Sequence, residues 1–136
     1  MNTRTGAIVI VAAMGGAVLG IGLDRTVIAQ QEGIKRTMLQ TIDNPASDKH
    51  QAVMGLAELA PGASSGKHRH YGVELGYVVE GTVIVEHDGR APVTLQPGQS
   101  FKNDGPHNAK NGGTTPAKIL AVYLVEKGKP LAEPVQ

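Results

Sequence analysis

The chain has 136 residues, of which 13 are basic and 12 acidic, and its formal net charge is +1. This near-neutral balance, without a run of basic residues or interleaved aromatic residues, argues against nucleic acid as a partner. The chain has no cysteine, which excludes disulfide bonds and thiolate chemistry, so any metal ligands must be histidines and carboxylates.

The first 29 residues have the order of regions that is typical of an export signal. A short polar start with Arg4 precedes the uncharged, mostly apolar segment 7–23, and Val27-Ile28-Ala29 ends on the small residue that signal peptidase prefers. We therefore predict that residues 1–29 are a signal peptide. The alternative is an uncleaved membrane anchor, although the apolar segment is slightly shorter than the roughly 20 residues of a membrane span. Both interpretations place the folded part outside the cytoplasm, periplasmic or secreted, and after cleavage no membrane contact is expected.

Residues 30–136 suffice for one domain, and they contain no sustained helical period of apolar residues. Short alternating or β-branched segments between turn residues predict strands instead. Asp88-Gly89 predicts a two-residue hairpin turn, and the tail from Lys127 is expected to lie over the surface or to be loose. Strands of this length and density predict an all-β sandwich or barrel. In chain order, the expected strands cover residues 33–40, 52–59, 73–79, 82–87, 91–95, 100–102, 107–110 and 119–126.

Residues 62–81 carry polar side chains at a spacing that suits a metal ion. His68, His70 and Glu74 are two and four residues apart, so in an extended strand their side chains share one face. His107 lies further along the chain and must reach them from a neighbouring strand. Three imidazoles and one carboxylate are a complete set of protein ligands for a divalent transition metal.

These residues resemble the first motif of the cupins, G-x5-H-x-H-x3-4-E-x6-G, which matches in full from Gly62 to Gly81. The second cupin motif, G-x5-P-x-G-x2-H-x3-N, matches at His107 and Asn111, whereas Gly98 lies nine residues before His107 instead of eleven. Asn111 has the same parity as His107 and is a candidate for orienting a ligand.

The resemblance implies that nearly all of residues 30–136 form a cupin domain, a jelly-roll barrel also called a double-stranded β-helix. It also implies a homodimer, for which residues 33–40 are the natural segment to exchange between subunits. The metal ligands that it implies are His68, His70, Glu74 and His107.

Three histidines with one glutamate suit Fe, Mn, Ni, Cu or Zn, and the sequence does not choose among these metals. Four protein ligands leave two positions of an octahedral ion for water, a small molecule or dioxygen. By resemblance we expect a small-molecule metalloenzyme of the dioxygenase type. The alternative is a non-catalytic periplasmic cupin that binds a metal or, through the metal, a small ligand. No catalytic residue is assigned.

Further polar residues have a weaker claim to the site. Glu58 alternates with Met54 and Leu56, which would place it in the barrel interior as an acid or base. Tyr77 and Tyr123 lie on apolar strands and are interpreted as packing residues. The remaining histidines, His50 and His87, are expected to be exposed to solvent. The same is expected of Lys67 and Arg69 beside the ligands, and the alternative for these two cations is that they attract an anionic substrate.

Overall fold

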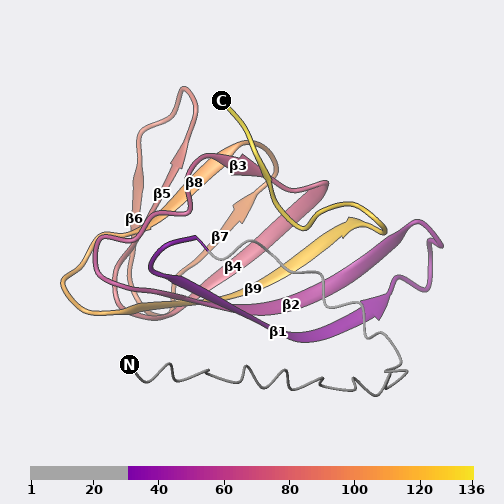
Figure 1. Cartoon of the computed structure of the whole chain (residues 1–136), viewed down its shortest axis with the longest axis horizontal. Helices are drawn as coiled ribbons and strands as arrows, with labels where there is room; N and C mark the ends of the chain where they lie inside the picture. Colours follow the sequence, from indigo (N-terminus) through magenta and orange to yellow (C-terminus); the bar gives the residue numbers. More distant parts are fainter. Residues whose placement is uncertain (1–30) are drawn as a thin grey trace, which may run out of the picture.

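The computed structural model of the protein describes residues 31–136, and the predicted signal segment 1–29 lies outside them. Within the described part, the chain folds into two five-stranded antiparallel sheets with the orders β1-β2-β9-β4-β7 and β10-β3-β8-β5-β6. The predicted all-β jelly-roll fold is confirmed (Figure 1). No helix with the length and apolarity of a membrane span occurs in this part of the chain.

The observed strands extend most of the predicted ones by a few residues and add two short strands. Their bounds are β1 (Ile34–Asp43), β2 (His50–Leu59), β3 (His68–Arg69), β4 (Gly72–Glu80), β5 (Val83–His87), β6 (Val93–Leu95), β7 (Ser100–Asn103), β8 (His107–Asn111), β9 (Ala117–Glu126) and β10 (Glu133–Pro134).

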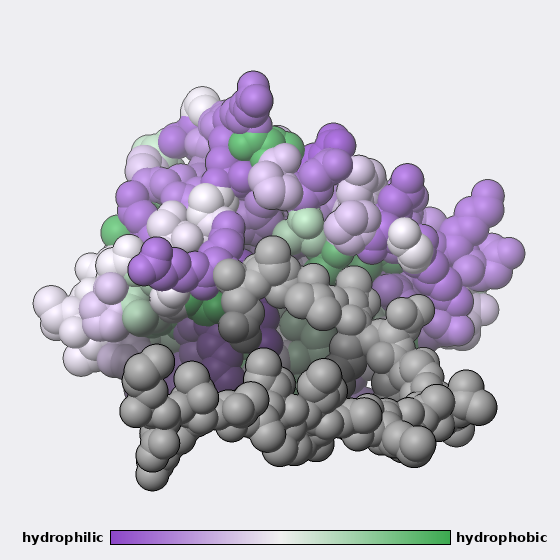
Figure 2. Space-filling view, in the orientation of Figure 1, coloured by the Kyte–Doolittle hydropathy of each residue, from purple (hydrophilic) through white to green (hydrophobic). Residues whose placement is uncertain are grey.

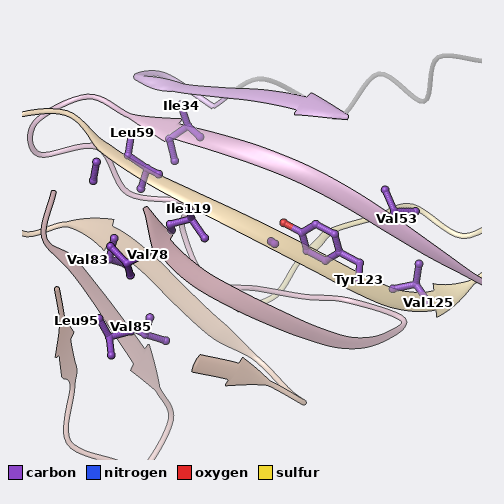
Figure 3. Packing of buried hydrophobic residues seen from close by; sticks show 12 residues of the cluster. Ile34, Val53, Leu59, Val78, Val83, Val85, Leu95, Ile119, Tyr123 and Val125 are labelled. Carbon is purple, nitrogen blue, oxygen red and sulfur yellow. The ribbon is translucent and has the colours of Figure 1, made fainter. Parts of the chain in front are cut away.

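Strand β9 illustrates why this sequence forms a two-layer barrel. Its odd-numbered residues are buried apolar residues, and the residues between them are half-buried or exposed. Because side chains alternate across a strand, this pattern turns one complete apolar face toward the opposite sheet. Figure 3 shows Ile119 and Tyr123 of this strand beside core residues from both sheets. The twelve buried apolar residues are Ile34, Val53, Leu59, Val78, Val83, Val85, Leu95, Ala117, Ile119, Ala121, Tyr123 and Val125.

The outer face of β2 corrects one sequence-based expectation. Val53 and Leu59 are buried, so the alternating residues Met54, Leu56 and Glu58 point away from the barrel interior. Glu58 instead pairs with Lys35 at 3.4 Å. Its predicted interior position is therefore wrong, because the parity of the strand was assigned to the opposite face.

The connection between β5 and β6 is longer than predicted. The ladder between these strands ends at Val85 and Val93, and the backbone amide of Arg90 donates to the His87 carbonyl oxygen at 3.3 Å. Among the described residues only glycines have positive φ, so Asp88 lacks the conformation that a two-residue type I′ turn requires. The chain therefore turns at Asp88 and Gly89 as predicted, but the predicted two-residue hairpin connection with positive φ at both residues is wrong.

The tail forms an element of the fold. Strand β10 pairs with β3, and Arg69 bridges to Glu133 at 2.6 Å. The tail thus lies against the strand that carries the first histidine of the motif, and Figure 1 shows this tail as the yellow end of the chain near β3.

In the view of Figure 2 most of the described surface is hydrophilic, with apolar residues in small separate groups.

Candidate metal centre

The four predicted ligand residues meet between the two sheets. His68 lies on β3 and is paired with His107 on β8 in the antiparallel ladder, so the expected approach from a neighbouring strand is confirmed. His70 follows β3 directly, and Glu74 lies on β4. All four side chains are buried or nearly so, with His107 only 2% exposed.

Glu74 reaches the histidines by a different path from the one expected. Strands β3 and β4 belong to different sheets, so the chain crosses from one layer to the other between Arg69 and Gly72. His70 and Glu74 therefore face each other across the barrel rather than sharing one strand face. The expected proximity holds, but the assumption of one continuous strand is wrong.

The ligand atoms lie at distances that suit one metal ion. The ring nitrogens that His68, His70 and His107 offer lie within 4.8 Å of one another. Oε2 of Glu74 lies 3.3 Å from Nε2 of His70 and 3.2 Å from Nε2 of His107. Two ligand atoms at right angles with bonds of about 2.1 Å would be about 3 Å apart, so these contacts are close to those of a coordination sphere.

Each of the three imidazoles is oriented by a backbone carbonyl. Since a carbonyl oxygen can only accept, Nδ1 must carry the proton, and Nε2 of the neutral ring keeps its lone pair for a metal. The three carbonyls come from three separate segments of the chain. The hydrogen bonds run from His68 to Gly66 at 2.9 Å, from His70 to Leu131 at 2.5 Å and from His107 to Gly105 at 2.8 Å.

This arrangement leaves the inward nitrogens in need of a cation. Nε2 of His70 is buried without a hydrogen-bond partner in the described structure. Neutral Nε2 atoms and a carboxylate oxygen all present lone pairs, so their contacts at 3.2–3.3 Å are favourable only with a proton or a metal ion between them. The residues present therefore fit a transition-metal ion.

The electrostatics of the site favour the metal-binding protonation states of His68 and Glu74. Burial above all, with smaller contributions from the neighbouring His107 and His70, lowers the pKa of His68 to about 4, so this ring is neutral at pH 7. Burial raises the pKa of Glu74, but the contacts with His107, His70 and Asn103 outweigh burial and hold it below its usual range. A neutral imidazole and an ionised carboxylate are the forms that bind metals.

A buried amide supports Glu74 from behind. Asn103, only 1% exposed, donates from Nδ2 to Glu74 Oε2 at 2.7 Å, and its Oδ1 lies 2.9 Å from Nε2 of His87. His87 is half-buried at the end of β5, and its expected place as an exposed hairpin residue is wrong. His87 is not part of the histidine cluster that could hold a metal, but it is linked to Glu74 by the hydrogen bonds of Asn103.

The four residues line a small cavity of about 40 Å³ inside the barrel. Apolar residues make up much of the remaining wall, and Tyr123 stands with its ring centroid 4.8 Å from that of His70. Burial and the charge of Glu74 raise the pKa of Tyr123, so its hydroxyl stays protonated and can donate to a bound ligand. Arg36 of β1 also lines the cavity.

The structure places the other candidates away from the cavity. Asn111 is buried, but its amide donates to the carbonyl oxygens of Leu59 and Thr115. It therefore stabilises the turn after β8 and does not orient a metal ligand. Tyr77 is 47% exposed on the outer face of β4. As expected, the remaining three lie at the surface with partners of their own: His50 with Ser47, Lys67 with Asp88 and Arg69 with Glu133.

Three contributors to the site have no signal in the sequence motifs. Asn103 lies 29 residues from Glu74, to which it donates, and Leu131 lies 61 residues from His70, whose ring it accepts from. Arg36 reaches the cavity from β1. Their roles arise from long-range pairing. The one available hint was a polar residue, Asn103, directly after the short predicted strand 100–102.

Comparisons with known proteins agree with the geometry. The family model for the cupin domain matches residues 55–123. No match was found among curated proteins. Among solved structures, a cupin superfamily protein from Desulfitobacterium hafniense is similar with a TM-score of 0.55 and 19% identity over 71% of this chain and 82% of that chain.

Two further structures are similar in fold. A predicted oxalate decarboxylase from Thermotoga maritima has a TM-score of 0.56 and 26% identity over 68% of this chain and 80% of that chain. Oxalate oxidase in complex with the substrate analogue glycolate has a TM-score of 0.61 and 21% identity, and the match covers 79% of this chain and 57% of that chain. With the matched family model, the jelly-roll fold and the histidine cluster together, the chain belongs to the cupin family.

Proposed function

We propose that this cupin binds a divalent transition metal through His68, His70, Glu74 and His107 and acts as a small-molecule metalloenzyme of the dioxygenase type. The observation that carries the proposal is that the Nε2 atoms of the imidazoles and Oε2 of Glu74 point at one another with their lone pairs. Fe, Mn, Ni, Cu and Zn all suit this set of ligands.

The bound ion would supply open coordination positions for a substrate and, with a redox-active metal, for dioxygen. The protein's own residues hold the ion, keep water out and donate one hydrogen bond. Ile34, Leu59 and Ile119 form an apolar wall, which lowers the local dielectric and strengthens polar contacts inside. The Tyr123 hydroxyl is a donor in the cavity wall, and its ring lies beside that of His70.

The small cavity favours a small ligand over a large flat one. Two proteins of similar fold are named for oxalate, and small carboxylic acids therefore belong among the candidates beside catechols and enediols. The alternative is a non-catalytic binding protein. It is supported by the small number of polar groups in the wall beyond the ligands, chiefly Arg36, Ser65 and Tyr123.

The first test is the metal content of the purified protein with matched variants. We expect His68→Ala and His107→Ala to lose the bound metal, whereas His50→Ala, at an exposed histidine, retains it. Equal metal content in all four proteins would sink the site assignment. Oxygen uptake with catechols, enediols and small keto acids then separates the two functions, since no uptake by any metallated form would favour the binding protein.

We also propose that residues 1–29 direct export and that the mature single domain, residues 30–136, works in the periplasm or outside the cell. The support is the order of regions in the sequence. The N-terminal sequence of protein recovered from the periplasmic fraction should begin at Gln30. An intact N-terminus on membrane-bound protein would favour the anchor, and recovery from the cytoplasm would contradict export.

A homodimer is the third part of the proposal. Strand β1 is an edge strand that pairs only with β2 in the described structure, and it exposes Leu39 and Ile42, the latter by 68%. A second copy that pairs with this edge would cover both side chains. Light scattering should give twice the monomer mass for the wild type and the monomer mass for Ile42→Lys. A monomeric wild type at micromolar concentration would contradict the dimer.

A further inference from the structure

Arg36 is the permanent cation in the wall of the metal cavity. Strand β1 places it there by alternation: Ile34 is buried in the core, Lys35 turns outward to pair with Glu58, and Arg36 turns inward again. Its partner in the ladder is Ala57, which packs against the core. The half-buried guanidinium therefore shares the cavity with the three histidines.

The guanidinium is held in place without being neutralised. Its Nη2 donates to Oε1 of Gln31 at 3.2 Å, and the Gln31 amide in turn donates to the carbonyl oxygen of the buried Ser65. In residues 31–136 no carboxylate lies within ion-pair distance of Arg36, in contrast with Lys35 beside it. A neutral amide fixes the direction of the cation and leaves its charge unpaired.

The cavity therefore carries an excess of positive charge once a divalent ion is bound. Glu74 offsets part of the charge of the metal, the three imidazoles are neutral ligands, and Arg36 adds a full positive charge. An unpaired charge in a poorly solvated site is costly, and a carboxylate that enters the cavity relieves this cost. A ligand that stays uncharged, such as an amide, does not.

We propose that Arg36 binds the carboxylate of a small anionic ligand whose other oxygen reaches the metal centre. The guanidinium offers two parallel N–H donors that match a carboxylate, which an ammonium group does not. The small cavity favours a ligand of a few carbon atoms. This inference rests on the proposed function and narrows its substrate class to small carboxylic acids with a second carboxylate, hydroxyl or keto oxygen.

The test is a calorimetric titration of the Zn-loaded protein with malonate and with malonamide, its uncharged analogue of the same size. The wild type should bind malonate at least about tenfold more tightly than malonamide, because only malonate makes charge-assisted hydrogen bonds. Arg36→Gln should weaken malonate binding about 10- to 100-fold and leave malonamide binding unchanged. Arg36→Lys keeps the charge but loses the two parallel N–H donors, so its affinity for malonate should lie between those of the wild type and Arg36→Gln. Lys35→Gln, on the outer face of the same strand, is the matched control and should bind like the wild type.

Metal content, measured on every sample, separates the two claims. If Arg36→Gln retains zinc and binds malonate as tightly as the wild type, the assignment of Arg36 is overturned while the metal site stands. Equal affinity of the wild type for malonate and malonamide overturns it as well. If the wild type takes up no transition metal, the proposed function fails. Arg36 is then judged on the metal-free protein, where malonate binding must disappear in Arg36→Gln.

Discussion

The side-chain amide of Asn103 donates a hydrogen bond to Glu74, with 2.7 Å between Nδ2 and Oε2. Because an ionised carboxylate only accepts, this contact fixes which end of the amide faces Glu74. Oδ1 of Asn103 then faces His87, whose Nε2 must be the donor across 2.9 Å. The hydrogen-bonded chain from His87 through Asn103 to Glu74 holds the Glu74 carboxylate in its orientation. It is not a proton relay, because the Asn103 amide does not pass protons readily.

The first prediction concerns this chain. Asn103→Leu removes both hydrogen bonds and should lower metal affinity about 10- to 100-fold, as loss of an outer partner of a metal ligand does. The measurement is competition with a chelator of known affinity. His87→Phe should weaken binding less, and His87→Gln, which keeps a donor, should restore most of it.

Non-additivity distinguishes a positioning role from general damage. If His87 acts only through Asn103, the double variant His87→Phe with Asn103→Leu should bind metal no more weakly than Asn103→Leu alone. His50→Phe, the same exchange at an exposed histidine, is the control. A multiplicative loss in the double variant, or an unchanged affinity in Asn103→Leu, would contradict this assignment.

The second prediction is proton release on metal uptake. In the metal-free protein a proton must lie between Glu74 Oε2 and the Nε2 atoms of His70 and His107 to make their short contacts favourable. The metal ion replaces it, so about one proton should leave per ion bound at neutral pH. Calorimetry in buffers of different ionisation enthalpy measures this number. It should fall in Glu74→Gln, and a wild type that releases no proton would refute the tautomers assigned to the histidines.

The third prediction is an acid-sensitive metal-free protein. The folded state holds the pKa of His68 at about 4, below the ordinary value of 6.5, so between these pH values the unfolded chain takes up a proton that the folded chain does not. Stability is therefore present above pH 6.5 and is lost as the pH falls toward 4. The loss should be about 2 kcal/mol, since residual solvent contact weakens the full effect.

Denaturant unfolding of the metal-free protein at pH 7 and pH 4.5 checks this expectation. His68→Phe keeps a ring and removes the proton, so it should lose distinctly less stability across the same interval. Glu74 has a depressed pKa and adds its own loss only below its ordinary value of 4.5. An equal loss in His68→Phe and the wild type would show that other groups cause the acid sensitivity.

The sequence predicted the fold well because local alternation decides most of it. Every predicted strand overlaps an observed one, and the buried set of β9 follows the period of two directly. The strands that were missed, β3 and β10, have two residues each, too few for any period. Glu58 was assigned to the interior because alternation defines two faces without saying which one is buried.

The site was predictable only as far as its motif extends. His68, His70, Glu74 and His107 meet as expected, although β3 and β4 belong to different sheets. The sequence gives no sign of the contacts that orient these ligands, because the partners are backbone carbonyls and a distant amide. Whether Arg36 faces the cavity depends on the parity of β1, which the structure determines.

The fourth prediction concerns two glycines in turns. Gly81 has φ of +76°, and an added Cβ would lie 2.7 Å from the backbone of Ala117. Gly81→Ala should therefore lower the free energy of unfolding by about 2–4 kcal/mol, from left-handed strain and a backbone clash. Gly89 has φ of +70° with no neighbour within 4 Å, so Gly89→Ala should cost only about 1 kcal/mol. Chemical denaturation measures both, and equal losses would contradict the clash.

The hydrogen bond from His70 to the Leu131 carbonyl bears on how quickly the site exchanges its ion. Strand β10 holds only two residues, and its detachment leaves the paired long strands of the barrel intact. Elements with so few contacts open far more often than the whole domain unfolds. Each opening would free the His70 ring to turn away, so the residence time of the proposed metal ion would follow the lifetime of this short strand. A tightly bound ion can in this way still be replaced within the life of the folded protein.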